Sequence, residues 1–176
     1  MGPPSTAAPA TWLTGHAHLL PPRGRALDVA CGAGRHARWL ASRGYDTRAI
    51  DRDVARVQAL SAEAIRAGLV LRAEVHDLED GSFVLPPRAY DLIVVVHYLH
   101  RPLVPSLRAA LANGGVLVYE TFTRAQALRG RPVNPNFLLE PGELLALVDG
   151  LDVLAHREGD FEGRMVAGVV ARQPTG

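Results

Sequence analysis

The sequence predicts an α/β fold with a doubly wound, mostly parallel sheet, and three observations carry that prediction. From about residue 11 onward, short aliphatic runs alternate with segments of helical periodicity, which is typical of strands joined by crossover helices. The segment YDLIVVV (90–96) is aliphatic on both faces, as a strand in the middle of a covered sheet must be. Near the C-terminus, two apolar runs are separated by the short segment GDFEGR, which indicates a hairpin.

The individual elements follow from local signals. RALDVA (25–30) is expected to be a buried strand that ends in a Gly-rich turn, and a helix over 35–43 should follow and end at Gly44. Asp53 is a suitable N-cap for the next helix, which Gly68 should end. The remaining elements are expected as strands at 47–51, 69–75, 90–96 and 116–122, helices near 102–112 and 141–150, a long loop at 123–140, and hairpin strands at 151–158 and 165–172.

Length and composition limit the class of protein. The 176 residues are enough for one domain, expected at residues 11–176 behind a flexible tail at residues 1–10. All 19 basic residues are arginine, which excludes a lysine Schiff base, a lysine nucleophile and a phosphate-binding loop with its lysine. The net charge of +1 gives no general attraction to nucleic acid or membranes, and the single Cys31 fits a reducing compartment. We therefore expect a cytoplasmic monomer or homodimer without a metal site.

The turn after the first strand has the pattern of a nucleotide-binding loop. CGAGRHA (31–37) satisfies G-x-G-x-x-G/A between a strand and a helix, and residues without side chains let a ligand lie against the turn. Asp51 ends the next strand, 17 residues after Gly34, where a carboxylate can accept hydrogen bonds from both hydroxyls of a ribose. The two features together predict a cofactor that contains adenosine.

Asp28 favours one such cofactor over another. It lies in the first strand, four residues before Gly32, where a nicotinamide-binding chain normally has an apolar residue. A buried carboxylate is costly unless it is paired, and the ammonium group of S-adenosylmethionine would pair with it, whereas a pyrophosphate would be repelled. The alternative is that Asp28 only accepts hydrogen bonds from nearby backbone donors.

At this point the sequence resembles a known family. ALDVACGAGRHA (26–37) is similar to the first motif of class I S-adenosylmethionine-dependent methyltransferases, and the resemblance continues over roughly residues 11 to 172. In order, the matching positions are Asp51 for the ribose-binding acid, His76-Asp77-Leu78 for the adenine-contacting segment, YDLIVVVHYLH for the fourth-strand motif and NGGVLVYETF for the fifth strand. Within the family, the chain is most similar to small tellurite-resistance-type and other small-molecule methyltransferases. The resemblance implies a Rossmann-like sheet of seven strands with an antiparallel last strand.

The resemblance also implies a set of cofactor-binding residues, drawn from the first motif and from the ends of the following strands. They are Asp28, Ala30, Cys31, Gly32, Gly34, Arg35, Asp51, Arg52, Asp77, Leu78 and His97. Ala30 stands where many members have glycine. No Asn-Pro-Pro-Tyr-type tetrapeptide follows the fourth strand, which argues against methylation of amino groups on DNA bases. Without an inserted substrate domain, the acceptor must be recognised by the tail, the loop after the fourth strand and the loop of 123–140.

Candidate catalytic residues follow the central strands. Methyl transfer is an in-line displacement that positioning and desolvation can accelerate, and a general base is needed only if the acceptor arrives protonated. His100, Tyr98 and Glu120 are the candidates, because the carboxyl ends of parallel strands carry the ligand site. The alternative for His100 is that it caps the next helix, and the alternative for Glu120 is that it forms an ion pair with an arginine.

Three further residues are candidates for binding the acceptor. Arg101 and Arg131 could pair with an anionic group, and Trp12 could cover the site as part of a lid or, alternatively, lie at the edge of the core. Arg124 and Arg129 lie in the same long loop as Arg131.

The expected function is methyl transfer from S-adenosylmethionine to a small molecule. Two alternatives of another class are an NAD(P)-dependent oxidoreductase, from the literal G-x-G-x-x-A match, and a cofactor-binding module without catalysis, from the absence of a decisive catalytic residue. An RNA acceptor is a variant of the first reading, against which the near-neutral charge argues.

Overall fold

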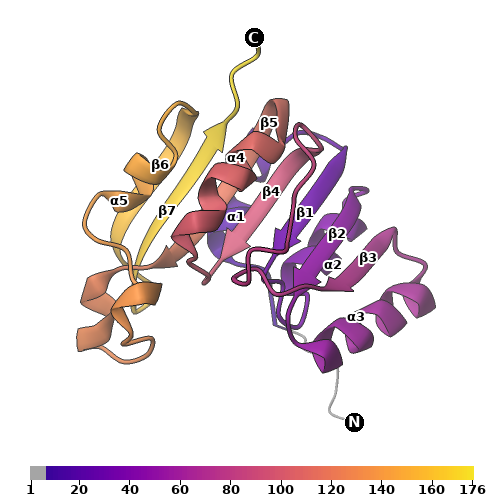
Figure 1. The fold of residues 1–176 in the computed structure, drawn as a ribbon, viewed down its shortest axis with the longest axis horizontal. Helices are drawn as coiled ribbons and strands as arrows, with labels where there is room; N and C mark the ends of the chain where they lie inside the picture. The colour runs from indigo at the N-terminus through magenta and orange to yellow at the C-terminus, as the bar shows by residue number, and fades with distance from the viewer. Residues whose placement is uncertain (1–6) are drawn as a thin grey trace.

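In a computed structural model that describes residues 7–176, seven strands form one sheet in the order β3-β2-β1-β4-β5-β7-β6 (Figure 1). Strands β1 to β5 pair in parallel, and β7 lies antiparallel between β5 and β6. This confirms the predicted fold class. The strands are β1 (Arg25–Val29), β2 (Asp46–Asp51), β3 (Leu71–Val75), β4 (Tyr90–Val96), β5 (Leu111–Phe122), β6 (Asp152–Phe161) and β7 (Arg164–Arg172).

Helices cover both faces of this sheet. In Figure 1, α4 crosses in front of the central strands and α1 lies behind them. The α-helices are α1 (Thr11–Gly15), α2 (Arg35–Ser42), α3 (Val54–Ala67), α4 (Val104–Ala110) and α5 (Glu143–Leu147). Short 3₁₀ helices are η1 (Ala17–Leu19), η2 (Arg101–Leu103), η3 (Arg124–Leu128) and η4 (Pro135–Phe137).

The central strand β4 is buried on both faces, as its sequence predicts. Ile93 and Val95 pack on the side of α4 and α5, whereas Leu92 and Val94 pack on the side of α1 and α2. All four side chains have no exposed surface. Because successive residues of a strand point to opposite faces, only a strand covered on both sides can be aliphatic throughout.

Several boundaries differ from those predicted, each for a local reason. The helix expected over 102–112 divides into η2 and α4 and ends at Ala110, and β5 begins at Leu111 rather than 116. A register shift between Tyr90 and Leu92 separates the start of β5 from its main ladder. Gly115 lies in this irregularity, where a Cβ would approach the Tyr90 carbonyl oxygen at 2.9 Å. Backbone crowding at Gly115 therefore determines where β5 begins, and the hydrophobic periodicity of the sequence does not reveal this boundary.

The helix caps and the hairpin turn agree more closely with the predictions from the sequence. The Asp53 carboxylate accepts a hydrogen bond from the Arg56 N–H at the start of α3, and Gly68 ends that helix in a left-handed conformation (φ +63°). The predicted hairpin is present, with longer strands than expected because Glu162 and Gly163 make a tight turn at φ +55° and +76°.

The N-terminal segment is bound to the domain where it is described. The Ala8 carbonyl oxygen accepts from Arg35, and the Ala10 N–H donates to His36 Nε2, both at 3.2 Å. The flexible tail was predicted for residues 1–10, of which 1–6 lie outside the described residues. Within 7–176, the helices are all too short or too polar to cross a membrane.

Candidate functional site

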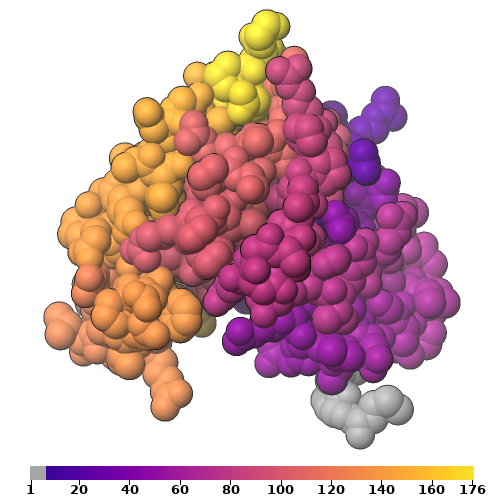
Figure 2. Space-filling view, in the orientation of Figure 1, coloured from indigo at the N-terminus to yellow at the C-terminus, as the bar shows by residue number. Residues whose placement is uncertain are grey.

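A cavity of about 960 Å³ opens at the carboxyl ends of the parallel strands, and in Figure 2 the surface is hollowed between the orange segment and the purple and magenta half. We call its first set of lining residues the β1–β3 half: Ala30, Asp51, Arg52, His76, Asp77, Leu78 and Glu79. We call the second set the β4–β5 half: His97, Tyr98, Leu99, Phe122, Arg131, Pro132, Val133, Asn134 and Phe137. Sites for single drug-sized ligands measure about 300–1,000 Å³, so this cavity has room for a large ligand or for two smaller ones.

The turn between β1 and α2 is built on left-handed backbone. Ala30, Gly32 and Gly34 have φ of +53°, +56° and +81°. At Gly34 a Cβ would lie 2.5 Å from a methyl carbon of Leu60, so glycine is required for α3 to pack against the turn. Ala30 adopts the conformation that glycine adopts freely, at a cost of roughly 1–2 kcal/mol for a residue with a Cβ. This explains why many members of the family that the sequence resembles have glycine at that position.

Asp51 ties the Gly-rich turn to the end of β2. Its Oδ2 accepts from the Gly32 N–H at 2.7 Å, and its Oδ1 accepts from the Asp53 N–H at 2.9 Å. A carboxylate has about four acceptor positions, so both oxygens can accept further hydrogen bonds. Asp51 is thus a fixed acceptor that faces the cavity.

Asp28 is buried and hydrogen-bonded to the backbone of α2. It is 1% exposed, and its Oδ2 accepts from the Ala37 N–H at 2.9 Å, in the first turn of α2. Burial raises the pKa of Asp28 to about 7, and burial together with Arg35 lowers the pKa of its neighbour His36 to about 3. Asp28 is not among the residues that line the cavity, so what it supports directly is the turn and the start of α2.

Four other predicted cofactor residues also lie behind the lining surface. Cys31 is buried against Ala37 and Leu60, and this burial raises the pKa of its thiol. The Arg35 guanidinium bonds to the Ala8 carbonyl oxygen. Gly32 and Gly34 shape the turn through their backbone. The structure brings the remaining predicted cofactor residues to the cavity: Ala30, Asp51, Arg52, Asp77, Leu78 and His97.

His97 and Phe122 form an aromatic pair in the β4–β5 half. Their rings stack with centroids 4.6 Å apart, and the left-handed backbone of His97 (φ +56°) donates its N–H to the Glu120 carbonyl oxygen. Burial lowers the pKa of His97 to about 4, and Arg164 and Arg35 add to the shift. The imidazole is therefore neutral near pH 7.

Tyr98 is a hydrogen-bond donor at the junction of the two halves. Its hydroxyl donates to Glu79 Oε1 at 3.4 Å, and burial and the neighbouring Glu79 raise its pKa above the ordinary value. A phenol held in its protonated form can orient a ligand, but it is a poor general base near neutral pH.

Glu120 and Trp12 lie in the core and do not line the cavity, which is the arrangement that their structural alternatives predict. Glu120 is 5% exposed and accepts from Arg157 Nη2 at 2.5 Å. The Arg157 guanidinium lies over the rings of Trp12 and Phe161 at 4.7 and 4.1 Å. Trp12 is 4% exposed and packs against Gly168, where a Cβ would lie 2.8 Å from its ring. Both residues take the structural alternatives.

Arg101 makes several contacts within the protein, and it is not among the residues that line the cavity. Its guanidinium pairs with both carboxylate oxygens of Glu143, at 2.5 and 2.9 Å. It also donates to the carbonyl oxygens of Asn136 and Leu138 at 3.1 and 3.0 Å. Arg101 thereby fastens the segment 123–140, which walls the cavity, to the start of α4.

His100 is likewise not among the residues that line the cavity. Its carbonyl oxygen accepts from the Leu103 N–H at the start of η2, but its side chain makes no capping hydrogen bond. The capping alternative therefore holds for the backbone alone.

Seven lining residues are not predicted individually from the sequence: Glu79, Leu99, Phe122, Pro132, Val133, Asn134 and Phe137. The first three lie beside a predicted site residue or at a predicted strand end, and the other four lie in the loop 123–140 that was expected to recognise the acceptor. Within residues 7–176, no three or more His, Cys, Asp or Glu side chains are grouped to hold a metal ion.

The sequence matches a known family and known proteins. The sequence matches the family described as "Methyltransferase domain" over residues 26–115, about half of the chain. It is 30% identical over 131 residues to the ubiquinone biosynthesis O-methyltransferase of Burkholderia pseudomallei, a match that covers 65% of this chain and 50% of the relative. The chain thus spans half or less of the length of the curated relatives that it matches.

Solved structures support the fold. A S-adenosylmethionine-dependent methyltransferase from Mesorhizobium loti superposes with a TM-score of 0.73 at 19% identity, covering 93% of this chain and 98% of that one. TehB from Haemophilus influenzae superposes with a TM-score of 0.75 at 20% identity, covering 96% of this chain and 63% of that one. With the family match spanning β1 to the start of β5, the chain belongs to the methyltransferase domain family, in the class I S-adenosylmethionine-dependent group.

Proposed function

We propose that the protein transfers a methyl group from S-adenosylmethionine to a small-molecule acceptor. The observation that carries this proposal is the fixed Asp51 carboxylate, which faces the cavity directly beside a left-handed Gly-rich turn. A ribose with two free hydroxyls is the partner that such an acceptor suits, and the turn admits the close approach of a ligand.

The other residues of the β1–β3 half fit the rest of this cofactor. One carboxylate oxygen of Asp77 accepts a hydrogen bond from the Glu79 N–H at 2.9 Å. The other oxygen can accept one from the amino group of the adenine base. Leu78 offers an apolar contact beside it, and Ala30 lies at the turn where the methionine part would approach. The bound cofactor would supply an activated methyl group on a positively charged sulfur.

The residues of the β4–β5 half would act by positioning and by excluding water. Neutral His97 can accept a hydrogen bond from the acceptor, and the Tyr98 hydroxyl, which donates its hydrogen to Glu79, can accept one through its oxygen. His97 is a weak base because its pKa is lowered to about 4, so the proposal favours an acceptor that is already nucleophilic near neutral pH. Placement of the two reactants can supply much of the acceleration.

A small acceptor is supported by the cavity and by the relatives. The segment 123–140 walls the cavity on one side, and one curated relative carries the name of a ubiquinone biosynthesis O-methyltransferase. The net charge of +1 supports a small molecule over nucleic acid.

Calorimetry with S-adenosylhomocysteine, the demethylated product, tests the cofactor assignment. Wild type should bind it, and Asp51→Asn should bind it roughly 10- to 100-fold more weakly, because it loses charge-assisted hydrogen bonds to the ribose. Asp53→Asn is the matched control: it removes a carboxylate two residues away and keeps a good N-cap, so binding should not change. The proposal fails if folded wild type binds neither S-adenosylhomocysteine nor S-adenosylmethionine. Binding of NADH instead would support the oxidoreductase alternative.

A further inference from the structure

We propose that the acceptor is an apolar, ring-sized molecule with an anionic group, and that Arg131 binds this group at the mouth of the cavity. The inference rests on the proposed function, which assigns the β4–β5 half of the cavity to the acceptor. Its separate basis is the distribution of charge and apolar surface around the cavity.

The two halves of the cavity differ in charge. All three carboxylates that line it, Asp51, Asp77 and Glu79, belong to the β1–β3 half. The β4–β5 half contributes a single charged side chain, Arg131. An anionic group in this half therefore meets a cation and no lining carboxylate, except near the junction where Glu79 reaches Tyr98.

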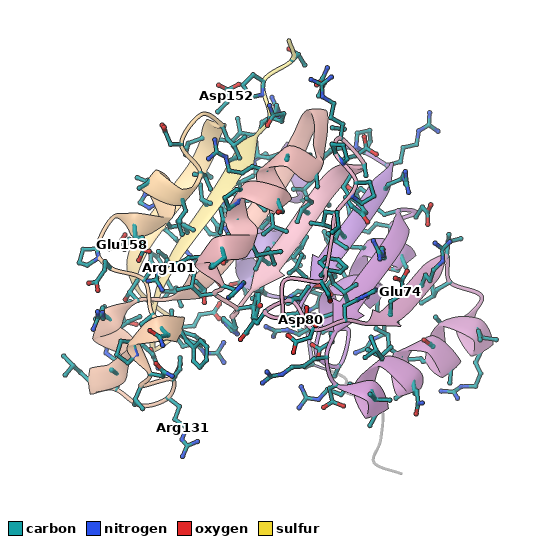
Figure 3. The ribbon with its side chains drawn as sticks, in the orientation of Figure 1. Glu74, Asp80, Arg101, Arg131, Asp152 and Glu158 are labelled. Atoms are coloured by element: carbon teal, nitrogen blue, oxygen red, sulfur yellow. The ribbon has the colours of Figure 1, made fainter. Side chains whose placement is uncertain are left out.

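The other arginines of the segment 123–140 are occupied in ion pairs. Arg124 Nε donates to Glu140 at 2.7 Å, and Arg129 Nη1 donates to Asp160 at 2.5 Å. Among residues 7–176, no carboxylate forms an ion pair with Arg131. In Figure 3, the Arg131 side chain extends from the tip of this segment away from the protein. It is the arginine of the segment that remains available to a ligand.

The backbone of Arg131 is held in place although its side chain is exposed. Its carbonyl oxygen accepts from Gln126 Nε2 at 3.1 Å, and Gln126 is 7% exposed. The other end of the same amide, Gln126 Oε1, accepts from the Met165 N–H at 2.9 Å and so ties the segment to β7. The backbone of Arg131 is therefore held at the rim of the cavity, from which the exposed guanidinium can turn toward a ligand.

The walls beside Arg131 are apolar and aromatic. His97 and Phe122 present a stacked pair, and Val133 and Phe137 leave 60% and 44% of their surface exposed. Large exposed apolar side chains that line a cavity are typical of a surface that a ligand covers. A flat apolar body beside these rings would place an anionic substituent within reach of the rim.

The charges around His97 agree with this assignment. Arg164 and Arg35 both contribute to lowering its pKa, so the surroundings of the imidazole are positive. A cationic acceptor would be repelled there, whereas an anionic one would be attracted.

The test compares three matched compounds on the complex with S-adenosylhomocysteine. They are a hydroxynaphthalene carboxylate, its methyl ester and the corresponding aminomethyl compound, with dissociation constants measured by ligand-observed NMR or calorimetry. The carboxylate should bind at least about ten-fold more tightly than the other two. Arg131→Gln should weaken carboxylate binding about 10- to 100-fold, the range for a charge-assisted hydrogen bond, without changing ester binding. Arg129→Gln, which removes the same charge from the same segment, is the matched control and should bind the carboxylate like wild type.

The outcomes separate this inference from the proposed function. If S-adenosylhomocysteine binds but the ester or the amine binds as tightly as the carboxylate, the acceptor assignment is overturned and the methyltransferase assignment stands. The acceptor assignment is likewise overturned if the carboxylate does not bind, or if Arg131→Gln and Arg129→Gln weaken carboxylate binding equally. If S-adenosylhomocysteine itself does not bind, the failure lies in the proposed function.

Discussion

Replacing Glu120 with leucine should destabilise the protein and leave cofactor binding intact, because Glu120 neutralises a buried arginine. The side chains of Glu120 and Arg157 are 6% and 20% exposed, and their ion pair measures 2.5 Å. The Nε of Arg157 is buried without a hydrogen-bond partner among the described residues, so Glu120 carries most of the compensation.

The expected loss follows from this geometry. Removing one partner of a buried ion pair costs about 3–5 kcal/mol. Arg157 keeps some solvent contact and its positions over Trp12 and Phe161, which places the expected cost near the lower end, at about 3 kcal/mol. Glu120→Gln keeps an acceptor oxygen and should cost only about 1 kcal/mol. The double variant Glu120→Leu/Arg157→Leu should recover part of the loss, since it leaves no buried charge.

Urea denaturation at pH 7 measures these differences, with S-adenosylhomocysteine calorimetry on each folded variant as the functional control. For a domain of this size, 3 kcal/mol corresponds to a decrease in Tm of about 6–12 °C. The reasoning would be refuted if Glu120→Leu unfolded within about 0.5 kcal/mol of wild type, a change no larger than an ordinary surface substitution. It would also be refuted if Glu120→Gln kept full stability and cofactor affinity but lost turnover, since Glu120 would then act in the reaction.

Three further variants test other parts of the site. Arg101→Lys cannot reproduce the two-pronged ion pair or the bonds to the segment 123–140, so trypsin should cut that segment several-fold faster while S-adenosylhomocysteine affinity is retained. Gly34→Ala combines φ +81° with a Cβ 2.5 Å from Leu60, and it should lower the free energy of unfolding by about 2–4 kcal/mol in urea and weaken cofactor binding. Burial raises the pKa of Asp28 from 3.8 to about 7, so wild type loses stability as pH rises between those values. Asp28→Asn has no such loss, and its stability relative to wild type should rise by on the order of 4 kcal/mol from pH 4 to 7; buried His36, whose effect has the opposite sign, is present in both proteins.

The features that the sequence predicted well are those encoded by neighbouring residues. The aliphatic run of β4, the Gly-rich turn and the N-cap Asp53 each depend on a few adjacent positions, and all three are present. Asp51 was found because the turn and the acid lie one strand–helix unit apart, a distance that the fold itself fixes.

The predicted site residues that the structure places outside the cavity depend on contacts between distant segments. Glu120 does lie near the carboxyl end of β5, but strand alternation places it on the same face as Val118, toward α1. There it meets Arg157, 37 residues away on β6. Arg101 is a similar case, since its partner Glu143 comes 42 residues later. No local pattern reports such a pair.

Because the sequence has no lysine, arginines in structural ion pairs must be distinguished from arginines that can bind a ligand. Every side chain that is always cationic is an arginine, and the guanidinium group is suited equally to structural ion pairs and to ligand recognition. Composition therefore cannot separate the two uses, but the carboxylate partners can. Arg48, Arg101 and Arg157 each pair with a glutamate, whereas two arginines line the cavity without an acidic partner in residues 7–176, Arg52 and Arg131. Arg52 belongs to the β1–β3 half that we assign to the cofactor, and Arg131 belongs to the β4–β5 half, which is why we propose Arg131 as the cation that binds the acceptor.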